Sequence, residues 1–121
     1  MSRFRIASVL VVLVAFAAIA VGSASAATPT LQASVSGDSA FKISLKFKGK
    51  PVKTLKAGKY KVVVKDPATI HNFRLTGKGL NKATSVSGKG TFTWTVTLKK
   101  GKYTFDCDPH KTIMHGSFTV K

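Results

Sequence analysis

A short segment near the C-terminus gathers side chains that bind transition metals. Within the segment 107–114, Cys107 supplies a thiol, His110 an imidazole and Met114 a thioether. Two imidazole nitrogens and one thiolate in a trigonal set, with a weak and distant thioether on the axis, suit a copper ion that alternates between two oxidation states. The segment lacks one imidazole of this set. His71, which stands where one apolar strand-like run stops and another begins, is the natural fourth member.

Each of these residues also has an ordinary structural role available. A histidine at a strand end, such as His71, is more often a plain polar residue than a ligand, and methionine commonly fills gaps in a core. His115 directly follows Met114 and is a surface residue, a replacement for Met114, or a ligand for a second ion. The presence of all four side chain types favours a metal site. The choice between Met114 and His115 as axial ligand stays open.

The elements that position these residues follow an N-terminal targeting segment. Arg3 and Arg5 precede a nearly unbroken apolar run over residues 6–21, and the Ala-Ser-Ala tripeptide at 24–26 matches a cleavage site. The run is shorter than the roughly 20 apolar residues of a spanning helix. We therefore expect a helical signal peptide over residues 1–26 that is cleaved, and a mature chain without a membrane span. The protein would be exported to the periplasm, the cell envelope or the extracellular space.

The remaining residues, 27–121, are enough for one small domain with a single core, and we expect a monomer. Cys107 is the only cysteine in the chain, so an internal disulfide cannot form. A lone thiol outside the cytoplasm is a buried small hydrophobe, a thiol that pairs with another chain, or a thiolate held by a metal. His110 and Met114 follow Cys107 at ligand spacing, which favours the metal.

The chain is strongly basic, with 20 Lys+Arg against 4 Asp+Glu. Loss of Arg3 and Arg5 with the signal peptide lowers the net charge from +16 to +14. A positive surface attracts anionic partners, so we expect redox partners with an acidic surface or an anionic cell envelope. Export makes nucleic acid the least expected of the anionic partners. The alternative is that the lysines are solvent-facing strand positions that suppress aggregation.

Apolar and polar residues alternate with the period of a half-buried strand in several segments. These lie at 31–35, 41–47, 60–64, 92–96, 103–105 and 118–120, with shorter extended pieces at 52–55 and 71–75. The stretch 80–90 is small, polar and flexible in character. We expect Trp94 in the core, and Tyr103 to pack and hydrogen-bond near the end of its strand.

This spacing of short strands and turns predicts an all-β fold, a two-sheet antiparallel sandwich of Greek-key type. Strand ends from the two sheets meet at one pole of a sandwich. His71 can therefore reach Cys107 although 36 positions separate them in the sequence.

Three motifs resemble those of the small blue copper proteins, the cupredoxins, and in particular plastocyanin, pseudoazurin and amicyanin. They are His71-Asn72, the run from Gly101 to His110, and the run from Met114 to Val120. The resemblance implies a cupredoxin-like fold in which His71, Cys107 and His110 are the strong equatorial ligands of one copper ion and Met114 is the axial ligand. It also implies that His110 is the exposed route for electrons, flanked by Pro109 and Ile113. Asn72 is expected to tie the His71 loop to the Cys107 loop by hydrogen bonds.

The sequence departs from the family pattern at two points. Four positions separate His110 from Met114, which lies between the shorter spacing of amicyanin-like loops and the longer spacing of plastocyanin-like loops. Asp106, directly before the cysteine, replaces an apolar or aromatic residue. A carboxylate close to the thiolate is expected to lower the reduction potential unless it is turned to solvent.

Together these observations predict an exported copper protein that passes one electron at a time between partners and is not an enzyme. Sequence patterns of a catalytic triad, a paired carboxylate site or a phosphate loop are absent. Two other functions are compatible with parts of this pattern. A copper-binding protein that buffers or delivers copper would have the same ligands. A basic adhesive surface protein would not need them, so the four ligand types argue against it.

Overall fold

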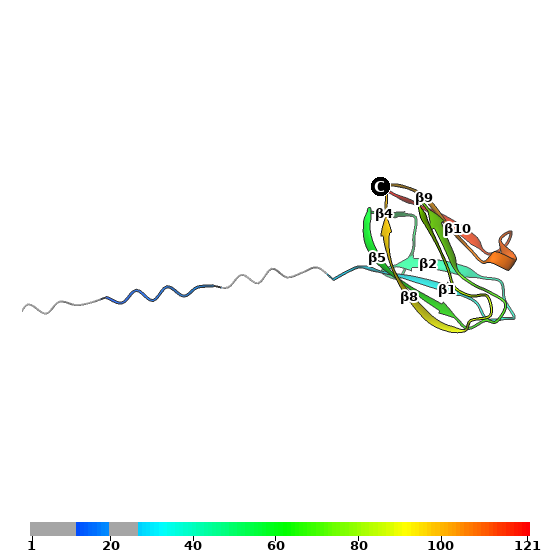
Figure 1. Ribbon diagram of the computed structural model, residues 1–121, viewed down its shortest axis with the longest axis horizontal. Helices are drawn as coiled ribbons and strands as arrows, with labels where there is room; N and C mark the ends of the chain where they lie inside the picture. The colour runs from blue at the N-terminus through cyan, green and yellow to red at the C-terminus, as the bar shows by residue number, and fades with distance from the viewer. Residues whose placement is uncertain (1–11, 20–26) are drawn as a thin grey trace, which may run out of the picture.

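The computed structural model describes residues 12–19 and 27–121 of the chain, and residues 27–121 form a β-sandwich (Figure 1). Residues 12–19 are exposed and form neither helix nor strand, contrary to the predicted signal-peptide helix. An isolated short helix is only marginally stable without a packing partner, which accounts for this difference. The rest of the predicted signal peptide lies outside the described residues. Among the described residues, no helix is long and apolar enough to cross a membrane.

The first sheet has five strands in the order β3-β2-β1-β5-β8. Their bounds are β1 Thr30–Val35, β2 Ile43–Phe47, β3 Lys50–Pro51, β5 Gly58–Asp66 and β8 Gly90–Leu98. Neighbouring strands are antiparallel except for β1 and β5, which run parallel.

The second sheet has five strands in the order β4-β10-β9-β6-β7. Their bounds are β4 Thr54–Leu55, β6 Arg74–Gly77, β7 Leu80–Ala83, β9 Gly101–Asp106 and β10 His115–Val120. Here β4 and β10 are the parallel pair. The predicted two-sheet all-β sandwich is confirmed, but each sheet is mixed rather than purely antiparallel. Alternation with period two is common to both kinds of pairing, so the sequence pattern could not distinguish them.

The core forms where the inward-facing residues of the two sheets meet. In β5, Tyr60, Val62 and Val64 are buried, while the lysines of the strand, at 59, 61 and 65, are exposed. Tyr103 on β9 is fully buried, and its hydroxyl accepts a hydrogen bond of 2.9 Å from the backbone N–H of Lys99, as predicted. Trp94 is half-buried and packs against the core. Among residues 12–19 and 27–121, the core residues all lie between Leu31 and Val120, so residues 27–121 carry a core of their own, as an independently folding domain requires.

Two segments differ from their sequence-based predictions. The strand expected from residue 41 begins only at Ile43, because residues 36–42 form a turn in which the N–H of Lys42 donates to the Ser36 hydroxyl. The segment expected to be flexible contains β7, which pairs with β6 through the two-residue turn Lys78-Gly79. The turn residues have φ angles of 23° and 77°, as the tight turns of hairpins require.

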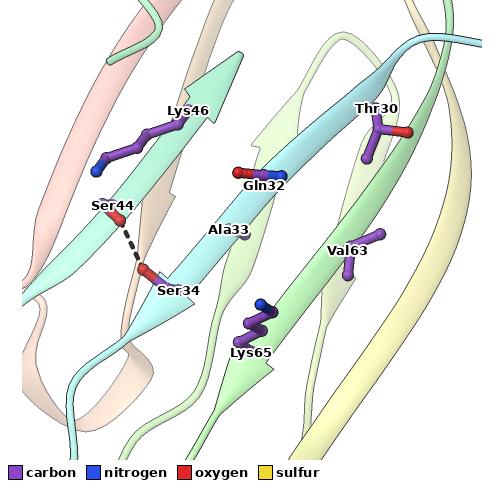
Figure 2. A pocket seen from close by; sticks show the side chains of 8 residues that line it. All are labelled: Thr30, Gln32, Ala33, Ser34, Ser44, Lys46, Val63 and Lys65. Atoms are coloured by element: carbon purple, nitrogen blue, oxygen red, sulfur yellow. Dashed lines mark hydrogen bonds between the residues drawn. The ribbon is translucent and has the colours of Figure 1, made fainter. Parts of the chain in front are cut away.

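The outer face of the first sheet carries small polar side chains from β1 and β2 (Figure 2). The hydroxyls of Ser34 and Ser44 share a hydrogen bond of 2.6 Å across these two strands. Because the side chains are short, they leave a shallow hollow of about 270 Å³ that reaches Lys46 on one side and Lys65 on the other. The hollow contains none of the predicted metal ligands.

The predicted ligands lie at one end of the sandwich, which we call the site end. Cys107 follows β9 directly, a single 3₁₀ turn spans Asp108–His110, and Met114 precedes β10. In Figure 1 this loop is the orange segment at the right, and the C-terminus lies at the opposite end. His71 lies in the connection between β5 and β6. The antiparallel pairing of β6 with β9 places the end of this connection beside Cys107, since Arg74 is opposite Asp106.

Candidate metal centre

Three donor atoms from distant parts of the chain converge at the site end. His71 Nδ1, Cys107 Sγ and His110 Nδ1 lie within 4.8 Å of one another. The nitrogens are 3.2 Å apart, and the sulfur is 3.8 Å from His71 Nδ1 and 3.5 Å from His110 Nδ1. A point equidistant from the three corners of this triangle lies about 2 Å from each, close to the bond lengths of transition metals to nitrogen and sulfur in proteins. The triangle therefore has the right size to hold one metal ion.

The hydrogen bond of His71 selects the nitrogen that faces this triangle. His71 Nε2 is 2.7 Å from the carbonyl oxygen of Ala40, which can only accept, so Nε2 carries the proton. Nδ1 of the neutral ring is then a free lone pair, as metal ligation requires. His110 Nδ1 is 3.2 Å from His71 Nδ1. A cation between the two nitrogens would bind the lone pair of His71 Nδ1, and it would bind that of His110 Nδ1 in the tautomer that carries its proton on Nε2.

The surroundings of Cys107 favour the neutral thiol over the thiolate. The side chain is fully buried, and burial raises the pKa of the thiol above its ordinary value. The backbone N–H groups of Asn72 and His110 lower the pKa by less than burial raises it, and the Asn72 N–H lies 3.4 Å from Sγ. A buried thiol of this kind deprotonates when a metal ion compensates its charge.

Asn72 joins the two loops that carry the donors. Its Oδ1 accepts a 2.7 Å hydrogen bond from the backbone N–H of Asp108, and its Nδ2 donates to Asp108 Oδ2 at 2.8 Å and to the carbonyl of Thr84 at 3.1 Å. The side chain is buried. The predicted tie between the His71 loop and the Cys107 loop is therefore confirmed, and it fixes the positions of their donors relative to one another.

A second tie between the loops had not been predicted from the sequence. Arg74 binds Asp108 in a bidentate manner, with Nε 2.6 Å from Oδ1 and Nη2 2.8 Å from Oδ2. The guanidinium is the main reason why the pKa of Asp108 lies below its ordinary value. Asp108 therefore remains a carboxylate directly beside Cys107, and Arg74 neutralises its charge.

Met114, directly before β10, and His115, the first residue of β10, differ in burial. Met114 is fully buried, its N–H donates to the carbonyl of His110 at 2.8 Å, and its own carbonyl accepts from the N–H of Cys107 at 3.1 Å. These bonds close the loop around the triangle. His115 is exposed, because side chains alternate along the strand and its neighbours Phe118 and Val120 point inward. The structure therefore favours Met114 over His115 as the additional donor.

Asp106 lies on the outer face of the second sheet. It is half-buried, and alternates with the buried side chains of Phe105 and Cys107 on β9. In the sheet it stands opposite Arg74 on one side and His115 on the other. The carboxylate that precedes the cysteine is thus directed away from the triangle, next to a guanidinium.

Phe41 is a site residue that sequence reasoning missed. Its ring meets those of His71 and His110 edge to face, with centroids 5.5 and 4.9 Å apart. The pattern had suggested an inward-facing strand residue, whereas Phe41 belongs to the turn before β2 and is 47% exposed. Together with exposed Ile70 and Ile113 it forms an apolar surface around the half-buried His110. The sequence feature that could have identified Phe41 is an aromatic residue within a polar turn.

A buried carboxyl group lies at the end of β5, five residues before His71. Asp66 Oδ1 accepts a 2.8 Å hydrogen bond from the N–H of Ala68, while Oδ2 has no partner in the described part of the chain. Burial raises the pKa of Asp66 above its ordinary value. This group helps to form the turn that leads into the His71 loop.

Comparisons with known proteins agree with this geometry. Residues 33–121 match the family model described as copper binding proteins, plastocyanin/azurin family. No curated protein sequence matches the chain.

Several solved structures share the fold of this chain. Rusticyanin from Thiobacillus ferrooxidans is 21% identical, with 80% of this chain and 79% of that chain covered at a TM-score of 0.56. A reduced rusticyanin is 20% identical, with 80% and 81% covered at a TM-score of 0.61. Dithionite-reduced auracyanin from Roseiflexus castenholzii is 22% identical, with 79% and 99% covered at a TM-score of 0.55. At these identities the likeness extends to the fold.

Proposed function

Because the chain belongs to the plastocyanin/azurin family of copper-binding proteins, we propose that it carries single electrons between redox partners outside the cytoplasm. The observation that supports this most is the triangle of His71 Nδ1, Cys107 Sγ and His110 Nδ1, whose size fits one copper ion. In this proposal His71, Cys107 and His110 would hold the ion as its three strong ligands, and Met114 would be the weaker fourth ligand. A copper ion bound there would supply one-electron chemistry between Cu(I) and Cu(II).

The residues around the triangle keep its shape constant. The Ala40 carbonyl and the Phe41 ring hold the His71 imidazole, and Asn72 and Arg74 hold Asp108 beside Cys107. Because most of these groups are buried or half-buried and they come from loops at the ends of both sheets, movement of the donors is restricted when the charge at the centre changes. A small rearrangement means a low barrier to electron transfer, which favours this function.

The route for electrons would run through His110. Its ring is half-buried and lies between the centre and the apolar surface of Phe41, Ile70 and Ile113. A partner that covers this surface would exclude water and bring its own redox centre close to the imidazole. Burial of His71, Cys107 and Met114 favours electron transfer over catalysis, because a catalytic metal keeps an open coordination position.

Export and partner chemistry complete the proposal. Residues 1–26 act as a cleaved signal peptide, residues 27–121 are the copper-binding domain, and the domain works as a monomer. Lys42 and Lys111 lie near the apolar surface and suit acidic groups at the edge of the partner's contact area. An electron-transfer rate that falls as salt is added would support an acidic partner, since salt screens exposed charges.

Copper buffering or delivery is the competing function. Delivery requires ligands that a recipient can reach and displace. The burial of three of the four side chains makes such an exchange slow, which favours retention of the ion.

The decisive experiment is a visible spectrum of the domain after loading with Cu(II). A short copper–thiolate bond should make the protein intensely blue, and the bound copper should undergo reversible one-electron reduction in voltammetry. Cys107→Ser should abolish the colour, because a hydroxyl cannot provide the thiolate. A histidine variant outside the centre, His115→Ala, is the matched control and should stay blue.

Two results would contradict the proposal. A colourless Cu(II) adduct of the unmodified domain would exclude the thiolate centre. Rapid loss of Cu(I) to a mild chelator, in a protein that exchanges electrons slowly with small redox reagents, would favour copper delivery instead.

A further inference from the structure

The charges of this protein are separated along the sandwich. All four acidic residues of the chain lie in or beside the loops of the site end, where they offset nearby basic residues: Asp38, Asp66, Asp106 and Asp108. The ion pair in the described part of the chain, Arg74 with Asp108, is also at this end. The excess of positive charge must therefore lie elsewhere.

The opposite end of the first sheet and the short strands next to it carry five exposed lysines. This end is fixed by the pairing of Leu31 with Phe47 and of Gly58 with Leu98. The lysines lie on the segments that flank these pairs: Lys48, Lys50, Lys53, Lys56 and Lys59.

The same end of the second sheet carries five more exposed lysines. They are Lys78, Lys99, Lys100, Lys102 and Lys121. The two groups form one surface, because the N–H of Ala57 donates to the Lys121 carbonyl and the N–H of Lys121 donates to the Leu55 carbonyl, both at 2.9 Å. We call this surface of both groups the lysine pole. Among the described residues, the lysine pole contains no acidic residue.

At two hairpin turns of the lysine pole, a lysine occupies a backbone conformation that other residues adopt more readily. Lys48-Gly49 and Lys78-Gly79 are the two-residue turns of the hairpins β2–β3 and β6–β7. Lys48 and Lys78 have φ angles of 51° and 23°, a region that residues with a side chain rarely adopt and for which asparagine or glycine is preferred. Both tips of the pole thus carry a lysine where another residue would suit the backbone better.

The lysine pole also contains a shallow hollow with an apolar floor. Its volume is about 480 Å³, and its floor includes Phe47, Val52 and Leu55. Lys48, Lys50 and Lys53 stand around it, and the Lys48 ammonium lies 5.2 Å from the centre of the Phe47 ring. Apolar side chains ringed by ammonium groups match the composition of a phospholipid, in which acyl chains lie beneath a phosphate.

The chain enters the domain at the lysine pole. β1 starts at Thr30, and the N–H of Lys61 donates to the carbonyl of Pro29 at 2.9 Å beside it. Residues 27–29 lead into β1 at the end opposite the orange loop in Figure 1, and the apolar run at 6–21 precedes them in the sequence. A chain delivered through a membrane by this segment would meet the membrane surface with its lysine pole.

We propose that the lysine pole binds the surface of an anionic phospholipid membrane and leaves the site end facing away from it. Its lysines come from turns and short strands of both sheets, so an extended charged plane can contact many of them together. A single polymer strand or a small acidic patch would contact fewer. The benefit of the orientation rests on the proposed electron transfer, since His110 then stays open to partners. The membrane binding itself does not depend on copper.

The test is sedimentation of the metal-free domain, residues 27–121, with vesicles that contain phosphatidylglycerol. Binding should rise with the phosphatidylglycerol fraction, fall with salt and be lost on pure phosphatidylcholine. The double variant Lys48→Asn/Lys78→Asn should weaken binding about 25-fold, because each lysine near a charged bilayer contributes about fivefold. The same variant should raise the unfolding temperature, since asparagine suits both turns.

The matched control removes the same charge from the site end. Lys65→Gln/Lys89→Gln should bind vesicles almost as the unmodified domain does. Equal losses for the two double variants would mean that total charge matters and that the pole does not, and this would overturn the proposal. Tight binding to polyglutamate with weak binding to vesicles would overturn it in favour of an acidic polymer.

A separate measurement distinguishes failure of this proposal from failure of the proposed function. The copper-loaded domain on phosphatidylglycerol vesicles should keep its blue colour and react with a soluble reductant as fast as the free domain. A blue protein that does not bind vesicles would refute only the proposed membrane binding. A colourless protein that binds them would refute only the proposed copper centre. A reductant rate that drops on the membrane would show that the site end faces the bilayer, which contradicts the proposed orientation.

Discussion

Replacement of Arg74 by methionine tests whether the ion pair beside the cysteine supports the centre. The change keeps most of the side chain's apolar stem and removes both hydrogen bonds to Asp108, together with a 2.6 Å bond from Nη1 to Asn81. Asp108 is then left with Asn72 as its side-chain partner. A carboxylate directly beside Cys107 loses the positive charge that balances it.

The expected loss in the free energy of unfolding lies between the values for breaking an exposed ion pair and a buried one. Arg74 and Asp108 are 31% and 28% exposed, so water can replace part of what is lost. Exposed pairs contribute up to about 1 kcal/mol, whereas breaking a buried pair costs about 3–5 kcal/mol. We expect the free energy of unfolding to fall by about 2 kcal/mol, which corresponds to roughly 8–16 °C in the unfolding temperature of a domain of this size.

Urea unfolding of the metal-free domain at several pH values measures this effect. Arg74 holds the pKa of Asp108 below its ordinary value of 3.8, so the pair stabilises the fold fully above that pH. The stabilisation is lost as the pH falls through the lower pKa of the folded protein. The difference between the two proteins should therefore be constant near neutrality and shrink below pH 3.8. In the copper-loaded protein the reduction potential should also fall, because an unbalanced carboxylate favours Cu(II) over Cu(I).

Lys82→Met is the control, since Lys82 is an exposed residue of the neighbouring strand β7 and its removal changes the net charge equally. Its effect on stability should stay within about 0.5 kcal/mol. The reasoning would be refuted by equal losses of stability in the two variants. A loss for Arg74→Met that persists undiminished in acid would also refute it.

Two further predictions concern single residues near the centre. Asp66→Asn should stabilise the metal-free domain by about 1–2 kcal/mol at pH 7, because it removes a buried charge whose Oδ2 lacks a partner. The gain should vanish in urea titrations near pH 3, since burial raises the pKa of Asp66 and the native carboxyl is then neutral. Met114→Gln should retain the copper and lower its reduction potential in voltammetry, because an oxygen donor favours Cu(II). No change in that variant, with a large shift for His115→Ala, would assign the axial position to His115.

The parts of the site that could be predicted from the sequence are those close together in the chain. The spacing of Cys107, His110 and Met114 places their side chains in one loop whatever the strand order. His71 could be predicted as a ligand from its position between two apolar runs, since the ends of strands from both sheets meet at one end of a sandwich. Asn72 and Tyr103 make the hydrogen bonds expected of them.

The parts that could not be predicted depend on turns and on distant pairing. Phe41 looked like an inward-facing strand residue, and only the Ser36 turn shows why it reaches the imidazoles instead. Arg74 and Asp108 are 34 positions apart, and their pairing follows from the register of β6 against β9. Strand β7 could not be predicted because only Leu80 is half-buried and its other residues are exposed, so apolar and polar residues hardly alternate.

The parallel pairs set the order of events when the chain folds. β1 must wait for β5, and β4 must wait for β10, whose register joins Leu55 to Val120 across 65 positions of the sequence. Contacts of such long sequence separation form late and slowly. A chain that emerges from its N-terminus therefore cannot complete the β4 edge of the second sheet until β10 has been made. Because Cys107, His110 and Met114 lie between β9 and β10, the metal donors come together only after the strands from β1 to β9 have been made.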